Sequence, residues 1–207
     1  MTPFTSHTGV AAALLRNNID TDAIIPSREI TSVGKTGLAA GLFANWRYRD
    51  VATREIEPDF VLNLPAQNGT SILLAGHNFG CGSSREHAVW ALAESGIRAI
   101  VAPSFGAIFF DNCVRNGLLP VVLPEADVQA LAAAVEVDPQ GRPLTLALQA
   151  GKLYGPGSIE YAITLGAEQR ELLLTGLDPI ARSLQMLPQI EAFEAEDRER
   201  YAWLYLS

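Results

Sequence analysis

The chain has 207 residues, 48% hydrophobic and 18% charged, a composition typical of a globular protein with its own core. Its formal net charge of −8 disfavours nucleic acid as a partner, because phosphate binding requires a basic surface. The sequence contains no run of about eighteen apolar residues, as a membrane span would require, and residues 1–15 lack the basic leading segment of a signal peptide. We therefore expect a cytoplasmic protein that does not enter a membrane.

Taken in chain order, the first part of the sequence predicts one strand followed by mostly irregular connections. Residues 7–16 (HTGVAAALLR) read as a strand, and the turn-forming stretch NNIDTD follows it. The apolar stretch 23–26 ends in a proline, which cannot donate to a sheet ladder. Residues 27–38 are expected to form a loop, and residues 39–49 a short helix.

The middle of the chain alternates between short apolar runs and longer helical patterns. Strands are expected at 71–75, 97–102 and 118–123. Helices are expected at about 84–95, 104–115 and 125–135, and Gly96 and Gly117 close the first two. Strands separated by helices tend to pair in parallel, so the pattern predicts a mixed α/β fold class.

The C-terminal part predicts a hairpin, a short helix and a helical extension. Residues 144–149 and 152–155 form the hairpin, with another strand at 163–165 and a helix that ends at Gly176. In the last stretch, apolar residues at 187, 190, 193, 201 and 204 indicate an amphipathic helix. This helix would either pack on its own domain or dock onto another subunit. We expect one domain over 1–207, with the extension starting at about 180.

A glycine-rich turn, GHNFGCGSSREH, fills positions 76–87 between a predicted strand and a predicted helix. The sequence Ser83-Ser84-Arg85-Glu86 fits a capping box, with Ser83 as N-cap and Glu86 reaching back to it. A helix cap does not require the two glycines Gly80 and Gly82. Glycines at such positions let backbone N–H groups approach a ligand closely. Together with Arg85, whose planar fork suits a carboxylate, the turn predicts an anion site with serine hydroxyls beside it.

Other site classes fit this turn less well. A phosphate loop requires a lysine, and a dinucleotide fingerprint requires a glycine where Arg85 stands. A thiol nucleophile remains an alternative, because Cys81 has His77 and His87 close in sequence. Cys81 and Cys113 are the only cysteines. Two thiolates are too few for an iron–sulfur cluster, so no metal site is expected in this chain.

The remaining kind of site is one that binds a substrate carboxylate and removes a proton from the neighbouring carbon. Arg85 and the N–H groups would hold the acid group, and a serine oxygen would face the neighbouring carbon. A helix terminus contributes only about 0.3–2 kcal/mol, which cannot turn a serine into an alkoxide at neutral pH. The site must therefore be completed by further charge, such as a metal centre on a partner, in a dry cavity.

Three long motifs carry a resemblance to a known family. The stretch NFGCGSSREHAVWAL (78–92) closely resembles the signature of the swivelling domain in the aconitase superfamily. The stretches NIDTDAIIP (18–26) and APSFGAIFFDNCVRNGLLPV (102–121) resemble the second and third motifs of that domain. Their order and spacing are similar to those of the small subunits of bacterial isopropylmalate isomerases. The resemblance is strong over about 7–123 and looser toward the C-terminus.

The resemblance implies a swivelling β/β/α domain and a hydro-lyase activity. The family interconverts 2-isopropylmalate and 3-isopropylmalate through isopropylmaleate, in leucine biosynthesis, and a separate large subunit carries the 4Fe-4S cluster. Carried over by motif, Ser83 would be the catalytic base and Asp22 an active-site carboxylate. Ser84 and Arg85 would bind the substrate carboxylate. The family's further substrate arginine has no clear counterpart, although Arg28 and Lys35 are nearby.

Substrate choice in related enzymes is set by the segment between Ile30 and Leu38, which follows the Thr-Asp motif. Ile30 and Val33 would meet an isopropyl group or pack within the loop. Lys35 keeps homoaconitate, citrate-like acids or methylmalate open as alternative substrates. A non-catalytic binding module with the same fold is the alternative of another class, which the intact Ser83-Ser84-Arg85 run and Asp22 disfavour.

Overall fold

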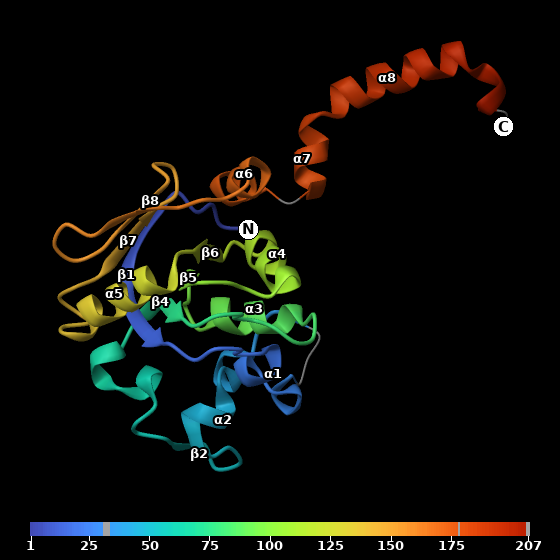
Figure 1. The fold of residues 1–207 in the computed structure, drawn as a ribbon. Helices are drawn as coiled ribbons and strands as arrows, with labels where there is room; N and C mark the ends of the chain where they lie inside the picture. Colours follow the sequence, from blue (N-terminus) through green and yellow to red (C-terminus); the bar gives the residue numbers. More distant parts are fainter. Residues whose placement is uncertain (31–33, 178, 206–207) are drawn as a thin grey trace.

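The protein, described by a computed structural model over residues 1–30, 34–177 and 179–205, is built on one seven-stranded sheet (Figure 1). The strand order is β6-β5-β4-β1-β7-β8-β9. Parallel pairing joins β1 (Ser6–Leu14), β4 (Thr70–Ala75), β5 (Ala99–Ala102) and β6 (Leu119–Val122). On its other side β1 pairs antiparallel with β7 (Leu144–Ala147). In turn, β7 pairs antiparallel with β8 (Lys152–Tyr154), and β8 with β9 (Glu160–Ala162).

Helices cover both faces of the sheet. Successive side chains of a central strand point to opposite faces, so each face contributes to its own core cluster. Leu73 and Ala75 of β4 belong to one core cluster, whereas Ile72 and Leu74 belong to the other. The first cluster includes buried residues of α1 (Thr21–Ile24) and α3 (Glu86–Glu94), and the second those of α5 (Glu125–Glu136). Residues of α4 (Ala107–Arg115) enter both clusters. The mixed α/β class predicted from the sequence is confirmed.

The remaining elements are short or peripheral. Two further helices are α2 (Ala44–Arg47) and α6 (Ala167–Thr175), and a separate ribbon joins β2 (Tyr48–Asp50) to β3 (Glu55–Ile56). The 3-10 turns are η1 (Ser27–Glu29), η2 (Ala39–Gly41), η3 (Val61–Asn63) and η4 (Pro65–Gln67). Most predicted strands and helices are found within a few residues of their expected positions, although α3 and α4 begin two to three residues later than predicted. Two predictions are wrong: residues 163–165 form no strand, and the helix expected at 39–49 is limited to Ala44–Arg47.

The C-terminal arm, which we define as residues 179–205, extends away from the sheet (Figure 1). It consists of α7 (Pro179–Gln185), α8 (Leu187–Arg200) and the 3-10 turn η5 (Ala202–Leu204). No residue of α8 is buried. The interpretation of a C-terminal helix packed on its own domain is therefore wrong. None of the helices in the described ranges has the length and apolar composition needed to cross a bilayer.

Candidate active site

The functional segments meet at one edge of the sheet because β1, β4 and β5 are parallel neighbours. The carboxyl ends of parallel strands lie at the same edge, where ligands of α/β proteins usually bind. The chain leaves β1 toward α1, leaves β4 into the turn at 76–85, and leaves β5 toward α4. Motifs about sixty residues apart in the sequence are thus brought side by side.

Backbone hydrogen bonds fix the glycine turn to both neighbouring segments. On one side, Gly80 N–H donates to the Ile19 carbonyl at 2.7 Å, and Thr21 N–H donates to the Cys81 carbonyl at 3.0 Å. On the other side, Gly106 N–H donates to the Phe79 carbonyl at 2.9 Å. The turn is therefore held like a short strand between two others, and its side chains project from a rigid backbone.

Two glycines of this region are required by packing as well as by backbone conformation. Gly80 has φ +72°, and a Cβ atom there would lie 2.1 Å from the ring of Phe109 on α4. A Cβ atom on Gly106 would lie 2.6 Å from the Gly80 carbonyl oxygen. From the sequence, Gly80 was expected only to let the backbone approach a ligand. In the structure it also allows α4 to pack against the turn.

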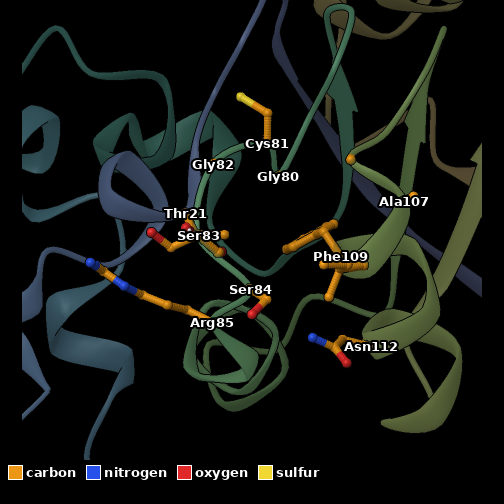
Figure 2. A pocket seen from close by; sticks show the side chains of 12 residues that line it. Thr21, Gly80, Cys81, Gly82, Ser83, Ser84, Arg85, Ala107, Phe109 and Asn112 are labelled. Atoms are coloured by element: carbon orange, nitrogen blue, oxygen red, sulfur yellow. Dashed lines mark hydrogen bonds between the residues drawn. The ribbon is translucent and has the colours of Figure 1, made fainter.

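The turn and α4 enclose a cavity of about 250 Å³ (Figure 2). Ser83 and Ser84 line it with exposed side chains, together with the partly buried Arg85. In Figure 2, Arg85 and Ser83 lie on the same side as Thr21, whereas Ser84 lies toward Asn112 of α4. The other lining residues are Gly80, Cys81, Gly82, Gly106, Ala107, Ile108 and Phe109.

Asp22, the fourth predicted site residue, contacts the cavity residues through its ion pair with Arg85. It does not line the cavity, but its carboxylate forms an ion pair with the Arg85 guanidinium. The Ser27 hydroxyl also donates to Asp22 at 3.3 Å, and the Thr21 hydroxyl donates to the Ser83 carbonyl at 2.9 Å. The structure thus brings Asp22, Ser83, Ser84 and Arg85 together at one end of α3.

The predicted capping box at the start of α3 is wrong. The N-cap residue is Arg85, and no side chain caps this helix end. Glu86 instead accepts a hydrogen bond from the Asn116 amide at 2.7 Å. The oxygen of that amide accepts from Trp90 Nε1 at 3.0 Å and from Lys35 Nζ at 3.1 Å. Because Glu86 is engaged elsewhere, the Ser83 hydroxyl is left outside the capping of the helix.

The environment of Cys81 disfavours a thiol nucleophile. Burial, and secondly the charge of Asp20, raise the pKa of the Cys81 thiol, so the reactive thiolate is depleted at neutral pH. Its side chain points away from Ser83 and Asn112 (Figure 2). The two histidines are engaged elsewhere, since His77 contacts Glu125 at 3.3 Å and His87 packs edge-on against a tryptophan.

The residues considered for substrate choice have structural contacts. Arg28 donates to Asn45, and the Lys35 ammonium lies 5.2 Å from the centre of the Trp90 ring in addition to its bond to Asn116. Ile30 packs against the first core cluster, which favours its interpretation as loop packing. Val33 lies outside the described residues.

The donor set of this chain does not fit an iron–sulfur cluster. Cys113 is fully buried in the core, which raises the pKa of its thiol well above the usual range. Within the described ranges, no three His, Cys, Asp or Glu side chains gather in a group that could hold a metal ion. A cluster would need at least one more thiolate than the chain contains.

Sequence reasoning missed Asn112 and Phe109 as cavity residues. Both belong to the long motif at 102–121. Their spacing of three on α4 places both on the helix side that faces the glycine turn. A helical projection of that motif would have indicated them.

The arrangement of sheet, glycine turn and Ser-Ser-Arg helix start defines a class of protein. Residues 1–126 match the family model described as the aconitase C-terminal domain. The match covers all three motifs and the parallel half of the sheet, including every predicted site residue. The fold class expected from the sequence, the swivelling domain of aconitase-type proteins, is confirmed.

Comparisons with individual proteins narrow this class. The chain is 61% identical over 205 residues to the 3-isopropylmalate dehydratase small subunit of Cupriavidus necator, with 99% of each chain covered. It is 47% identical over 211 residues to the protein of that name from Methylibium petroleiphilum, covering 99% of this chain and 97% of the other. A crystal structure of 3-isopropylmalate dehydratase from Methanocaldococcus jannaschii matches with a TM-score of 0.61 and 26% identity, covering 90% of this chain and 99% of that one. The chain belongs to the family of 3-isopropylmalate dehydratase small subunits.

Proposed function

We propose that this chain is the small subunit of a hydro-lyase that interconverts 2-isopropylmalate and 3-isopropylmalate through isopropylmaleate, in leucine biosynthesis. The observation that carries the proposal is the meeting of Ser83, Ser84, Arg85 and Asp22 at one cavity edge. This is the donor set required to hold a carboxylate and to take a proton from the carbon beside it. The close relatives named above support the substrate assignment.

The geometry supports one role for each of these residues. The Arg85 guanidinium, positioned by Asp22, and the Ser84 hydroxyl bind one substrate carboxylate. The Ser83 oxygen, ionised by the further charge that completes the site, faces the neighbouring carbon and accepts its proton. The hydroxyl on the adjacent carbon leaves with the electron pair of its C–O bond and takes a proton from solvent to become water. Rehydration in the opposite orientation gives the isomer, with Ser83 returning the proton.

The chain alone does not complete this site. Its cavity is open to water and the helix N-terminus contributes only about 0.3–2 kcal/mol, too little to activate a serine. We infer that a large subunit covers the cavity, and membership of the aconitase family indicates an iron–sulfur enzyme. Since the cysteines here do not fit a cluster, we assign the 4Fe-4S cluster to the large subunit. A biosynthetic role of this kind fits a cytoplasmic location.

Lys35 bears on the alternative substrates. A third carboxylate, as in homoaconitate, would need an additional cation, but the Lys35 ammonium is occupied by Asn116 and Trp90. The contacts of Lys35 therefore favour a diacid with an apolar substituent. The alternative of a non-catalytic binding module predicts that the chain adds no activity to its partner.

The experiment is hydration of isopropylmaleate, followed by ultraviolet absorbance. The chain alone and the reconstituted large subunit alone are expected to be inactive, whereas the mixture turns over. Activity of the chain by itself, or a mixture no more active than its parts, would contradict the proposal. Citraconate and homoaconitate as parallel substrates test the choice of diacid.

A further inference from the structure

Asn116 links the two sides of the cavity, which are the turn leading into α3 and helix α4. It directly follows Arg115, the last residue of α4, and stands one helical turn after Asn112, which lines the cavity. Residues four apart on a helix share a face, and α3 packs against α4. Asn116 is therefore placed where the two helices meet, although it does not itself line the cavity.

The side-chain amide of Asn116 uses all of its hydrogen-bonding capacity. Its nitrogen donates to the Glu86 carboxylate at 2.7 Å and to the Asn112 carbonyl at 2.9 Å. Its oxygen accepts from Trp90 Nε1 at 3.0 Å and from Lys35 Nζ at 3.1 Å. An asparagine amide has two N–H donors and one oxygen with two lone pairs. Every one of them is engaged, so the network fixes the orientation of the amide.

The partners of this amide come from three separate segments. Glu86 and Trp90 are four residues apart on α3 and present one face to Asn116, whereas Asn112 belongs to α4. Lys35 belongs to the segment that follows the Thr-Asp motif, and its ammonium also lies 5.2 Å from the centre of the Trp90 ring. A satisfied polar network of this kind holds its members in one arrangement.

The bond to Glu86 acts on the site because this residue directly follows the Ser-Ser-Arg run. A Glu86 side chain without that bond is free to reach back to the backbone N–H of Ser83, as in a capping box. The bond to the Asn112 carbonyl connects the amide to the other side of the cavity. Figure 2 shows Ser84 lying toward Asn112. The amide therefore sets the separation between a proposed carboxylate-binding residue and the opposite side of the cavity.

We infer that Asn116 is a positioning residue for the reaction proposed above. It holds the Ser-Ser-Arg run and α4 at the separation that a bound substrate requires, and it does so through Glu86 and Asn112 without touching the substrate. The inference rests on the proposed function, which supplies the substrate. A misplacement of about 1 Å at an active site costs about 100-fold in rate, so loss of such a link is measurable in the kinetics.

The test is Asn116→Asp in the enzyme reconstituted with the large subunit. Aspartate keeps the size of the side chain and the oxygen that Trp90 and Lys35 use, but it cannot donate, and it sets a second carboxylate against Glu86. We expect KM for isopropylmaleate to rise about 5- to 50-fold. KM does not depend on the amount of folded enzyme, whereas a purely structural loss would lower the maximal rate and leave KM unchanged.

A double variant tests the link to Glu86 directly. In Glu86→Gln combined with Asn116→Asp, donor and acceptor are exchanged, so the bond between the two positions is restored while the bond to the Asn112 carbonyl is not. We expect KM of this double variant to lie about threefold or more below that of Asn116→Asp alone.

Asn63→Asp is the matched control. The Asn63 amide donates to the carbonyls of Arg47 and Glu57 at 2.7 and 2.8 Å, and its oxygen accepts from Arg47 at 3.2 Å. This network does not line the cavity. We expect Asn63→Asp to lower the temperature of thermal unfolding and to change KM by less than about twofold, since the bonds it loses hold no part of the site.

Other outcomes would overturn the inference. An unchanged KM in Asn116→Asp would leave the amide a purely structural role, and so would an equal rise of KM in Asn63→Asp. A double variant no better than Asn116→Asp would show that the bond to Glu86 does not position the site. If the wild-type mixture fails to turn over isopropylmaleate, the proposed function is contradicted and the inference falls with it.

Discussion

The glycine turn and the C-terminal arm both expose side chains that the chain itself does not use, but they are built in different ways. Backbone hydrogen bonds hold the turn to segments on both sides, and its glycines pack directly against a neighbouring helix. The arm is held by local contacts at its base and tip. A rigid backbone gives the positional accuracy that catalysis requires, whereas the arm contributes no side chain to the cavity. Changes in the turn should therefore affect turnover, and changes in the arm should leave the chemistry unchanged.

Ser83→Ala should produce the largest effect. Loss of a general base typically reduces the rate about 10²–10⁴-fold, and we expect turnover of the reconstituted enzyme to fall by this amount. Folding should hardly change, because Ser83 is exposed and does not cap α3. Single-turnover hydration of isopropylmaleate measures the rate, and thermal unfolding measures stability.

Ser104→Ala is a useful control for this substitution. Its hydroxyl accepts a hydrogen bond from Asn78 N–H at 2.9 Å within the same loop region, but it does not line the cavity. We expect it to lower stability more than Ser83→Ala does and turnover far less. Near-normal turnover in Ser83→Ala would remove Ser83 from the catalytic role.

Arg85→Lys should have the next largest effect. The lysine keeps the charge but loses the planar fork that pairs with Asp22 and with a substrate carboxylate. A hydrogen bond to a charged group contributes roughly 1.5–3 kcal/mol, so kcat/KM should fall about 10- to 100-fold. Steady-state kinetics with isopropylmaleate give the value.

Arg49→Lys provides the comparison for Arg85→Lys. Arg49 forms an ion pair with Glu57 at 3.1 Å on the separate β2–β3 ribbon and does not line the cavity. Its replacement should leave both kinetic constants unchanged. If the two variants had equal kinetics, the carboxylate role of Arg85 would be wrong and a structural role would replace it.

Gly80→Ala tests whether the rigidity of the turn is needed. The added Cβ atom would meet the Phe109 ring at 2.1 Å in a backbone with φ +72°, so α4 must move or the turn must change. We expect a loss of about 1–3 kcal/mol in the free energy of unfolding and a lower kcat, measured by denaturant unfolding and by turnover.

Gly157→Ala separates the two causes. It has the same φ of +72°, but its Cβ atom would have nothing within 4 Å. Both variants share the backbone strain of a positive φ. The difference between their losses in the free energy of unfolding therefore measures the clash with Phe109 alone. A similar loss in both would show that packing against α4 is unimportant for the turn.

These comparisons indicate what could be read from the sequence. The parallel half of the sheet was predictable because its apolar runs and helix-closing glycines are local signals, as at Gly96 and Gly117. The capping box was not, because Glu86 bonds to Asn116, a residue thirty positions away that no local pattern indicates. The amphipathic C-terminal helix predicted from periodicity is wrong: α8 ends at Arg200, before Tyr201 and Leu204. Within α8, the acidic Glu194 and Asp197 lie on the same side as the apolar residues.

The site was predictable to a similar extent. The four residues Asp22, Ser83, Ser84 and Arg85 meet as expected, because their motifs follow neighbouring parallel strands. Their proposed roles stay predictions. The second function of Gly80, packing against Phe109, was hidden because both a ligand-binding and a packing glycine look the same in a sequence.

Cys81→Ser should have the smallest effect, and it separates the isomerase hypothesis from the thiol hypothesis. Burial and Asp20 raise the pKa of the thiol, so at neutral pH Cys81 is protonated and a poor nucleophile. Its carbonyl, which accepts from Thr21 N–H, is kept in the serine variant. We therefore expect turnover with the large subunit within about twofold of wild type, because a side chain that points away from the site contributes no transition-state contact. Alkylation by iodoacetamide should be slow at pH 7 and accelerate as the pH rises past the usual pKa of a cysteine. Abolished turnover in a Cys81→Ser enzyme that assembles normally, or fast alkylation at neutral pH that silences the chain, would instead establish the thiol as the reacting group and leave Ser83 without its proposed role.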